Sequence, residues 1–212
     1  MTLSCTLCDS TEVTHFFTDK HREYVQCKQC SLVFVPAQFH LTAEQEKALY
    51  DKHENHIEDK GYQAFLSRVV SPLQTYIAPQ SDGLDFGCGP GPALAHMLTG
   101  LGHTMSVYDI FYAPQTDVLT TQYDFVTCTE VIEHFHTPAK EWTILTELVK
   151  PQGTLAVMTK LVIDKDRFSN WHYKSDLTHV SFFSQTTFKF LAQRDGLSVE
   201  FFGNDVILFK KP

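Results

Sequence analysis

Four of the six cysteines have the spacing of a metal site. Cys5 and Cys8 form one C-x-x-C pair, Cys27 and Cys30 form a second, and residues 9–26 separate them. This arrangement is typical of a zinc ribbon, in which each pair closes a tight turn and four thiolates complete a tetrahedral Zn²⁺ site. Because such a site has no open coordination position, we expect a structural Zn²⁺. Two disulfides or free thiols are the alternative.

A second candidate site lies in GLDFGCGPGP, residues 83–92. Gly87, Gly89 and Gly91 follow a short apolar run that contains Asp85. Glycines let the backbone approach a ligand closely, and amides at the start of a following helix can bind it. Asp109 ends the next predicted strand, where nucleotide-binding α/β sheets hold ribose hydroxyls. Because a pyrophosphate would repel Asp85, the pattern differs from a dinucleotide fingerprint.

Several stretches carry a resemblance to one enzyme superfamily. LDFGCGPG (84–91) closely resembles motif I of the class I S-adenosylmethionine-dependent methyltransferases, YDFVTCTEVIEHFHTP (123–138) resembles their fourth strand and following loop, and ELVKPQGTLAVMTK (147–160) resembles their fifth strand and the turn before it. DLTHVSFFSQTTFKFLAQRDGL (176–197) resembles the subgroup that includes the ubiquinone-biosynthesis O-methyltransferases. The resemblance covers residues from about 83 to 210. It implies an α/β fold with a Rossmann-like seven-stranded sheet and flanking helices, joined to a small N-terminal zinc ribbon. Residues 110–122 are too few for the usual helix and strand at full length.

The same resemblance implies which residues bind S-adenosyl-L-methionine. The residues around the methionine moiety would be Asp85, Gly87, Cys88 and Gly89. Those near the ribose and the adenine would be Asp109 and Ile110, and those near the sulfonium would be Thr129 and Glu130. Tyr62 would cap the cofactor, with a plain core position as the alternative.

Histidines are the candidate catalytic residues. A sulfonium is already electrophilic, so the protein must align the acceptor and, for a hydroxyl or acidic carbon, remove a proton. Histidine suits that role near neutral pH. Segments expected at the C-terminal edge of the sheet or in the insert above it contain His134, His136, His172 and His179. The alternative for each is a structural role. By the same resemblance, Glu130, Glu133 and His134 could instead hold a catalytic divalent cation.

The elements that position these residues divide the chain into three predicted parts: a zinc ribbon at 1–40, a helical cap or linker at 41–80, and a methyltransferase domain at 81–212. The ribbon has predicted strands at 13–18, 22–27 and 31–36, and apolar residues four apart predict helices within 42–77. The insert at 163–184 contains Trp171, His172 and Tyr173, which either stack on an acceptor ring or pack the insert closed.

The charge and composition of the chain limit the kinds of partner that it can bind. The 212 residues carry a net charge of −8 with scattered basic residues, which disfavours a nucleic-acid surface. There is neither a signal-like N-terminus nor a run of eighteen apolar residues, so we expect a cytoplasmic protein without a membrane span. The sequence therefore favours a methyltransferase for a small-molecule acceptor, most readily an O-methyltransferase. Its ribbon would cover the acceptor pocket or mediate a homodimer. The alternatives are an RNA or protein methyltransferase that docks through the ribbon, and a non-catalytic cofactor-binding module.

Overall fold

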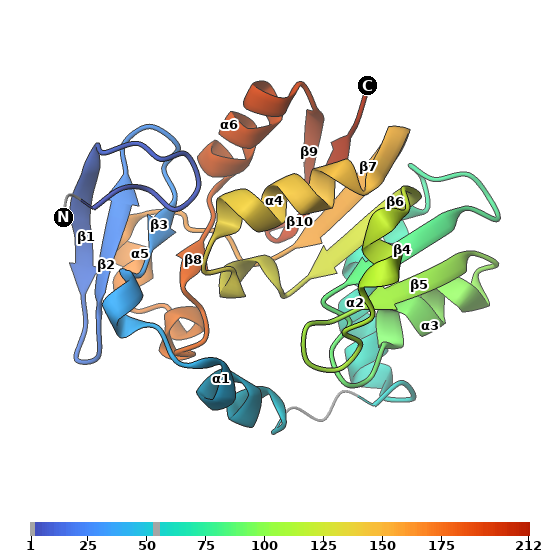
Figure 1. The fold of residues 1–212 in the computed structure, drawn as a ribbon, viewed down its shortest axis with the longest axis horizontal. Helices are drawn as coiled ribbons and strands as arrows, with labels where there is room; N and C mark the ends of the chain where they lie inside the picture. The colour runs from blue at the N-terminus through green and yellow to red at the C-terminus, as the bar shows by residue number, and fades with distance from the viewer. Residues whose placement is uncertain (1–2, 53–55) are drawn as a thin grey trace.

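The computed structural model describes residues 3–52 and 56–212, which form two sheets and their flanking helices (Figure 1). The larger sheet has the strand order β5-β4-β6-β7-β10-β9. Its strands are β4 (Asp82–Phe86), β5 (Thr104–Tyr108), β6 (Tyr123–Thr129), β7 (Val149–Met158), β9 (Ser198–Phe202) and β10 (Val206–Lys210). The first four are parallel, and β10 runs antiparallel to β7 and β9. The expected α/β fold class is confirmed.

The sheet differs from the expected seven strands by one. Residues 110–122, all of them described, form a connection that contains the short 3-10 helix η2 (Thr116–Thr120) and adds no strand beyond β5. This segment is too short for a full helix and a full strand, as its length indicated. The sheet therefore has six strands, and β5 is an edge strand.

Helices cover both faces of the large sheet. On one face lie α2 (Lys60–Leu73) and α3 (Ala93–Gly100), and on the other lie α4 (Pro138–Glu147) and α6 (Gln185–Asp195) (Figure 1). Neighbouring residues of one strand belong to different cores: Phe125 packs with α2 and α3, whereas Val126 packs with α4 and α6. Strands buried on both faces read as continuous apolar runs, which is why FVTC and LAVM lack alternation.

The smaller sheet contains the three strands predicted for the ribbon. They are β1 (Val13–Thr18), β2 (Glu23–Cys27) and β3 (Val33–Phe34), and a fourth strand comes from the distant insert, β8 (Ser181–Phe182). Val33 pairs with Phe182 and Phe34 with Ser181. The insert also contains the helix α5 (Lys165–Ser169) and the 3-10 helix η4 (His172–Ser175). The three strands of the ribbon therefore share a sheet with residues 181–182. The domain boundaries given above stay a prediction.

The aromatic residues of the insert pack inward. Tyr173 is 6% exposed and Phe168 is 2% exposed, and Trp171 lies against both rings at centroid distances of 5.1 and 5.8 Å. Tyr24 of β2 joins this cluster through an edge contact of 5.0 Å with Phe168. The arrangement agrees with the interpretation that these rings pack the insert closed.

Two helices lie where apolar spacing predicted them, within 42–77. The 3-10 helix η1 (Ala37–Phe39) leads from the small sheet to α1 (Ala43–Tyr50), whose N-terminus is capped by Thr42. Asp59 caps α2 by accepting bonds from two backbone N–H groups. Figure 1 shows α1 at the bottom of the view, below the two sheets. In residues 3–52 and 56–212, no helix has the length and apolar character that crossing a bilayer requires.

Candidate functional site

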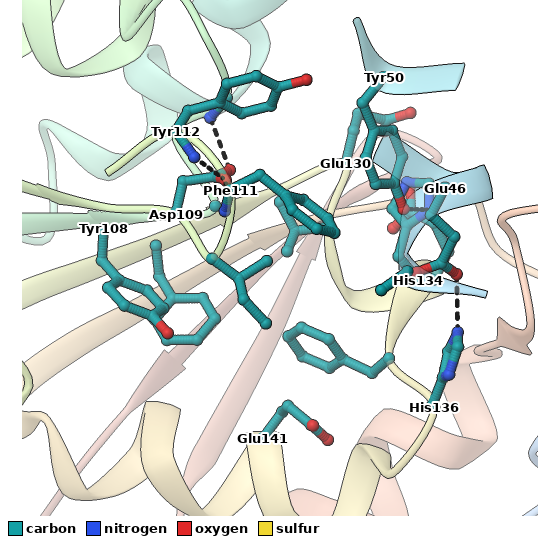
Figure 2. Close-up of a pocket in the computed structure, with 18 of the residues that line it drawn as sticks. Glu46, Tyr50, Tyr108, Asp109, Phe111, Tyr112, Glu130, His134, His136 and Glu141 are labelled. Carbon is teal, nitrogen blue, oxygen red and sulfur yellow. Dashed lines mark hydrogen bonds and ion pairs between the residues drawn. The ribbon is translucent and has the colours of Figure 1, made fainter. Parts of the chain in front are cut away.

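A cavity of about 720 Å³ opens at the carboxyl ends of β4, β5 and β6. Ligands of open α/β sheets bind at this edge. Figure 2 shows Tyr108, Asp109, Phe111 and Tyr112 on one side of the cavity, facing Tyr50, Glu130 and His134 on the other. Among the site residues predicted from sequence, the cavity is lined by Gly87, Gly89, Asp109, Ile110, Glu130, His134, His136 and His179. Its size suits a cofactor together with a small second ligand.

The glycine turn has the backbone that only glycine adopts readily. Gly87 and Gly89 have φ angles of 82° and 64°. A Cβ on Gly87 would lie 2.3 Å from Cγ2 of Val131, so the turn also lies too close to the loop after β6 for a side chain. The N–H of Gly89 donates to Oδ2 of Asp109 at 3.0 Å. The turn therefore exposes backbone to the cavity and is bonded to the acid that ends β5.

Asp109 also organises the loop that follows it. Its Oδ1 accepts hydrogen bonds from the N–H groups of Phe111 at 2.8 Å and Tyr112 at 3.0 Å. Ile110 is 69% exposed at the rim of the cavity. An exposed isoleucine beside Asp109 is consistent with a place for an apolar ligand face.

Asp85 lies beneath the turn rather than in the cavity wall. Its side chain is buried at 3% exposure, and its Oδ1 accepts from the Thr127 hydroxyl at 2.8 Å. Burial is the main cause that raises the pKa of this carboxyl to about 6; the charge of Asp109 contributes in the same direction, and hydrogen bonds from Thr127 and the backbone of Ala95 act against it. A buried carboxylate is stabilised by a nearby cation, so Asp85 fits an ammonium group reached through the turn or a water molecule.

Two other predicted cofactor residues lie outside the cavity lining. Tyr62 in α2 is partly buried, and burial followed by the charges of Asp85 and Glu130 raises its pKa to about 12. The thiol of Cys88 is half-buried, and burial raises its pKa to about 12, so it remains a neutral thiol at physiological pH.

The end of β6 holds two buried oxygen atoms that lack a partner within the described part of the chain: Oγ1 of Thr129 and Oε1 of Glu130. Glu130 has the left-handed φ of 52°, which a non-glycine residue adopts only when its surroundings require it. Burial raises the pKa of its carboxyl. Unpaired buried oxygens beside a cavity are what a ligand with donor groups or positive charge would satisfy. They fit a cofactor that carries both.

Glu133 is bonded deeper in the site. Its side chain is 1% exposed, and its oxygens accept from the hydroxyls of Thr159, at 3.0 Å, and of Tyr173. Burial, followed by the charge of Glu130, raises its pKa to about 8. Tyr173 also lies 3.4 Å from Oε2 of Glu130. One phenol thus links the two acids of the E-x-x-E-H segment.

The structure brings three of the four candidate histidines to the cavity. Nδ1 of His134 lies 3.2 Å from the carbonyl oxygen of Thr178 and 3.0 Å from the hydroxyl of Tyr50. His179 lies 4.7 Å from His134 between ring centroids, and burial lowers its pKa to about 4. His172 instead lies 3.2 Å from Nζ of Lys160 and does not line the cavity.

His136 forms a pair that the sequence did not reveal. Its Nε2 lies 2.8 Å from Oε1 of Glu46, and this bond raises the pKa of the imidazole (Figure 2). Glu46 and Tyr50 are both on α1, and both line the cavity. Their spacing of four residues places them on one face of a helix, which is the signal that could have identified them. Their partners lie 84 and 90 residues away along the chain, so no local pattern in the sequence indicates the pairing.

The predicted cysteine ligands converge as expected. The four sulfur atoms all lie within 4.8 Å of one another; they belong to Cys5, Cys8, Cys27 and Cys30. The closest pairs, Cys5 with Cys30 and Cys8 with Cys27, are 3.5 and 3.6 Å apart, and all four cysteines are free thiols. The disulfide alternative is therefore excluded for these residues. Four thiols grouped in this way form a donor set suited to Zn²⁺.

A second group of side chains could hold a cation. It differs from the set of Glu130, Glu133 and His134 that the resemblance implied. Ligand atoms of Glu133, His134 and His179 lie within 4.8 Å of one another, whereas Glu130 is not in this group. The oxygens of Glu133 already accept from two hydroxyls, and Nδ1 of His179 lies 2.7 Å from the carbonyl oxygen of Tyr173. Hydrogen bonds within the protein therefore account for the positions of Glu133 and His179.

Comparison with known proteins agrees with this geometry. A family model described as a methyltransferase domain matches residues 58–200. A search of the curated proteins found no match.

Solved structures are similar in fold. An O-methyltransferase family protein from Burkholderia thailandensis is 18% identical with a TM-score of 0.54, and the match covers 82% of this chain and 61% of that one. This chain thus spans less than two thirds of that protein's length. A chain from a complex of the Haloferax volcanii Trm112 methyltransferase activator with its candidate methyltransferase is 11% identical with a TM-score of 0.52, covering 78% of this chain and 96% of that one. At these identities the similarity concerns the fold alone.

Proposed function

The chain belongs to the methyltransferase domain family, and from this membership we propose that it transfers a methyl group from S-adenosyl-L-methionine to a hydroxyl group of a small molecule. The observation that carries the proposal is the meeting of two groups of residues in one cavity. The glycine turn and Asp109 line one side, and His134, His136 and His179 line the other. The proposed cofactor side and the proposed proton-accepting side thus face the same cavity.

The cofactor would contact the residues that combine backbone access with unsatisfied oxygens. Gly87 and Gly89 offer backbone, Asp109 offers carboxylate oxygens to the ribose, and Thr129 and Glu130 offer the unpaired oxygens at the end of β6. Asp85, Cys88 and Tyr62 support the turn and the methionine end, and Ile110 lies against the adenine. When bound, the cofactor supplies an activated methyl group on a positively charged sulfur. The chain's own residues align the acceptor and exclude water.

His134 is the proposed base. A carbonyl oxygen only accepts, so the bond to Thr178 places the proton of the neutral ring on Nδ1 and leaves Nε2 basic. His179 has a pKa near 4, which makes it a weak proton acceptor at neutral pH, and its role is to pack against His134. His136 and Glu46 lie at the rim, where the pair binds a polar group of the acceptor.

A structural Zn²⁺ bound by Cys5, Cys8, Cys27 and Cys30 completes the proposal. Tetrahedral sites with a Zn–S bond of about 2.3 Å place their sulfur atoms about 3.8 Å apart. The observed pairs at 3.5 and 3.6 Å fit that geometry with small adjustments. The metal would hold residues 1–40 together, since the three short strands there bury little apolar surface by themselves.

The position of the ribbon supports a small acceptor over a macromolecule. Strand β3 is paired with β8 of the insert, and both pack in one apolar cluster. The ribbon thus packs against the insert, which contributes Asp176 and His179 to the cavity lining, so the ribbon would act on the acceptor side through the insert. The segments TEVIEH and THVSFFS further support the proposed relation to the ubiquinone-biosynthesis O-methyltransferases.

The first experiment is calorimetric titration of the full chain with S-adenosyl-L-methionine, with zinc analysis of the same sample. We expect saturable binding and one zinc per chain. Incubation with a labelled cofactor and a panel of phenols, catechols, alcohols and amines then tests transfer. Absence of binding by the folded, zinc-loaded protein would overturn the proposal, and transfer to amines alone would overturn O-methylation.

A further inference from the structure

Arg22 is a buried cation in the turn between β1 and β2, far in sequence from the cavity. We infer that it is a positioning residue for methyl transfer: its guanidinium fixes the insert loop 174–177, and through that loop the rings of His134 and His179. The ribbon thereby shapes the acceptor side of the site. This inference rests on the proposed function, and its central readout does not depend on it.

The guanidinium of Arg22 donates three hydrogen bonds to backbone oxygens of the insert. The residue is 3% exposed. Its Nη2 donates to the carbonyls of Lys174 and Asp176, and its Nη1 donates to the carbonyl of Leu177, each at 2.9 Å. Its Nε donates to the hydroxyl of Tyr24 at 3.0 Å. Three convergent carbonyls on one planar cation define the path of the loop.

A short chain of hydrogen bonds leads from this loop to the histidines. The side chain of Asp176 accepts from the N–H of Thr178 at 2.9 Å and from its hydroxyl at 2.7 Å. The carbonyl of Thr178 lies 3.2 Å from Nδ1 of His134. Nδ1 of His179 lies 2.7 Å from the carbonyl of Tyr173, one residue before the clamped loop. Both rings therefore contact backbone oxygens that flank the Arg22 contacts, and the ring of His134 also contacts the hydroxyl of Tyr50 at 3.0 Å.

The contacts around loop 174–177 explain why its position depends on Arg22. Besides Arg22, the Tyr24 hydroxyl donates to the carbonyl of Lys174 at 3.3 Å, and just after the loop the N–H of Val35 donates to the carbonyl of Val180 at 2.9 Å. Without Arg22, the carbonyl of Leu177 would lose its donor, and the carbonyls of Lys174 and Asp176 would keep only the longer bonds from the Tyr24 hydroxyl and the His179 N–H, each at 3.3 Å. A buried carbonyl without a good donor is unfavourable enough to move the loop. Lysine would not replace it, because an ammonium group cannot present the same planar fork.

The test uses the full chain carrying Arg22→Lys, with Arg194→Lys as the matched control. Arg194 also bonds a ribbon carbonyl, that of Leu7 at 3.4 Å, but it does not touch the insert. Imidazole resonances are recorded by long-range ¹H–¹⁵N NMR and assigned with His134→Gln and His179→Gln. We expect Arg22→Lys to abolish or shift the Nδ1–H signals of both rings, with zinc content and cofactor affinity unchanged. Arg194→Lys should leave the signals in place.

Unchanged ring signals in Arg22→Lys would overturn the inference. If that variant does not fold, Tyr24→Phe tests the same contacts more gently, because it keeps the guanidinium and removes the acceptor of Nε together with the hydroxyl's own bonds to Asp19 and to the carbonyl of Lys174. A folded Tyr24→Phe protein with wild-type ring signals would then overturn the inference. With an acceptor that the wild type methylates, a misplaced base predicts that kcat falls about 100-fold while KM for the cofactor is unchanged. If the wild type binds no cofactor, the proposed function fails, and the ring signals still decide the role of Arg22.

Discussion

The N–H of Gly89 donates a 3.0 Å hydrogen bond to Oδ2 of Asp109, although twenty positions separate the two residues. The bond joins the glycine turn after β4 to the end of β5. Since the other oxygen of Asp109 holds the N–H groups of Phe111 and Tyr112, one carboxylate orders both walls of the cofactor side. The two oxygens of Asp109 thus bond the glycine turn on one side and the loop after β5 on the other.

Asp109→Ala removes these bonds and the proposed ribose contact. We expect the dissociation constant for S-adenosyl-L-methionine to rise about 10- to 100-fold, which corresponds to about 1–3 kcal/mol of lost hydrogen bonding. Calorimetry measures the change. Asp117→Ala is the control, because it removes an exposed acid from the following segment. Equal affinities for wild type and Asp109→Ala would contradict the assignment.

Gly87→Ala combines a disfavoured φ of 82° with a Cβ placed 2.3 Å from Val131. The backbone penalty alone is about 1–2 kcal/mol, and the overlap adds to it. Gly102→Ala isolates the first effect, since its φ is 93° and a Cβ there meets no atom within 4 Å. Thermal unfolding should show a larger loss for Gly87→Ala, and only that variant should lose cofactor binding. Similar losses of stability in both would show that the close approach to Val131 does not matter.

Cofactor binding should depend on pH through Asp85. Burial raises the pKa of its carboxyl from 3.8 to about 6, so the folded chain takes up a proton more readily than the unfolded one. Its contribution to stability is present below pH 4 and is lost as the pH rises to about 6, by at most about 3 kcal/mol. A bound ammonium group favours the ionised form, so affinity should increase from pH 5 to pH 7. Titrations at several pH values should show this increase in wild type and a flatter profile in Asp85→Asn.

Cys27→Ser should release the zinc and loosen the small sheet. Cys27 is fully buried and ends β2, which pairs with β3. We expect less than one zinc per chain and a loss of more than about 2 kcal/mol in the free energy of unfolding. Cys88→Ser, which changes a thiol outside the cluster, should retain the metal. If chelation of zinc left the unfolding curve of wild type unchanged, the structural role would be wrong.

His134→Gln should lower kcat by about 100-fold or more, since general-base catalysis contributes about that much, while cofactor affinity is retained. His172→Gln is the matched control because that ring lies outside the cavity lining. Transfer of a labelled methyl group measures both. Comparable activity of the two variants would exclude His134 as the base and return attention to the His136 and Glu46 pair.

Much of the cofactor side could be predicted from the sequence. Asp85, Gly87, Gly89 and Asp109 lie in short stretches whose order along the chain is the order of strand, turn and strand. Parallel strands bring such turns to one edge of a sheet. The four cysteines were predictable for a similar reason, since two C-x-x-C turns hold their own thiols in place. The missing strand was signalled by the short segment 110–122.

The acceptor side was decided by the tertiary structure. Which histidines face the cavity, the pairing of His136 with Glu46, and the contact of Arg22 with residues 174–177 all join segments about 90 to 150 residues apart. No local pattern encodes such contacts, because they arise only when α1, the ribbon and the insert pack together. The sequence by itself therefore determined the fold class and the residue types of the turn and the cysteine cluster. Packing between distant segments decided which polar groups share the cavity and which are buried as its support.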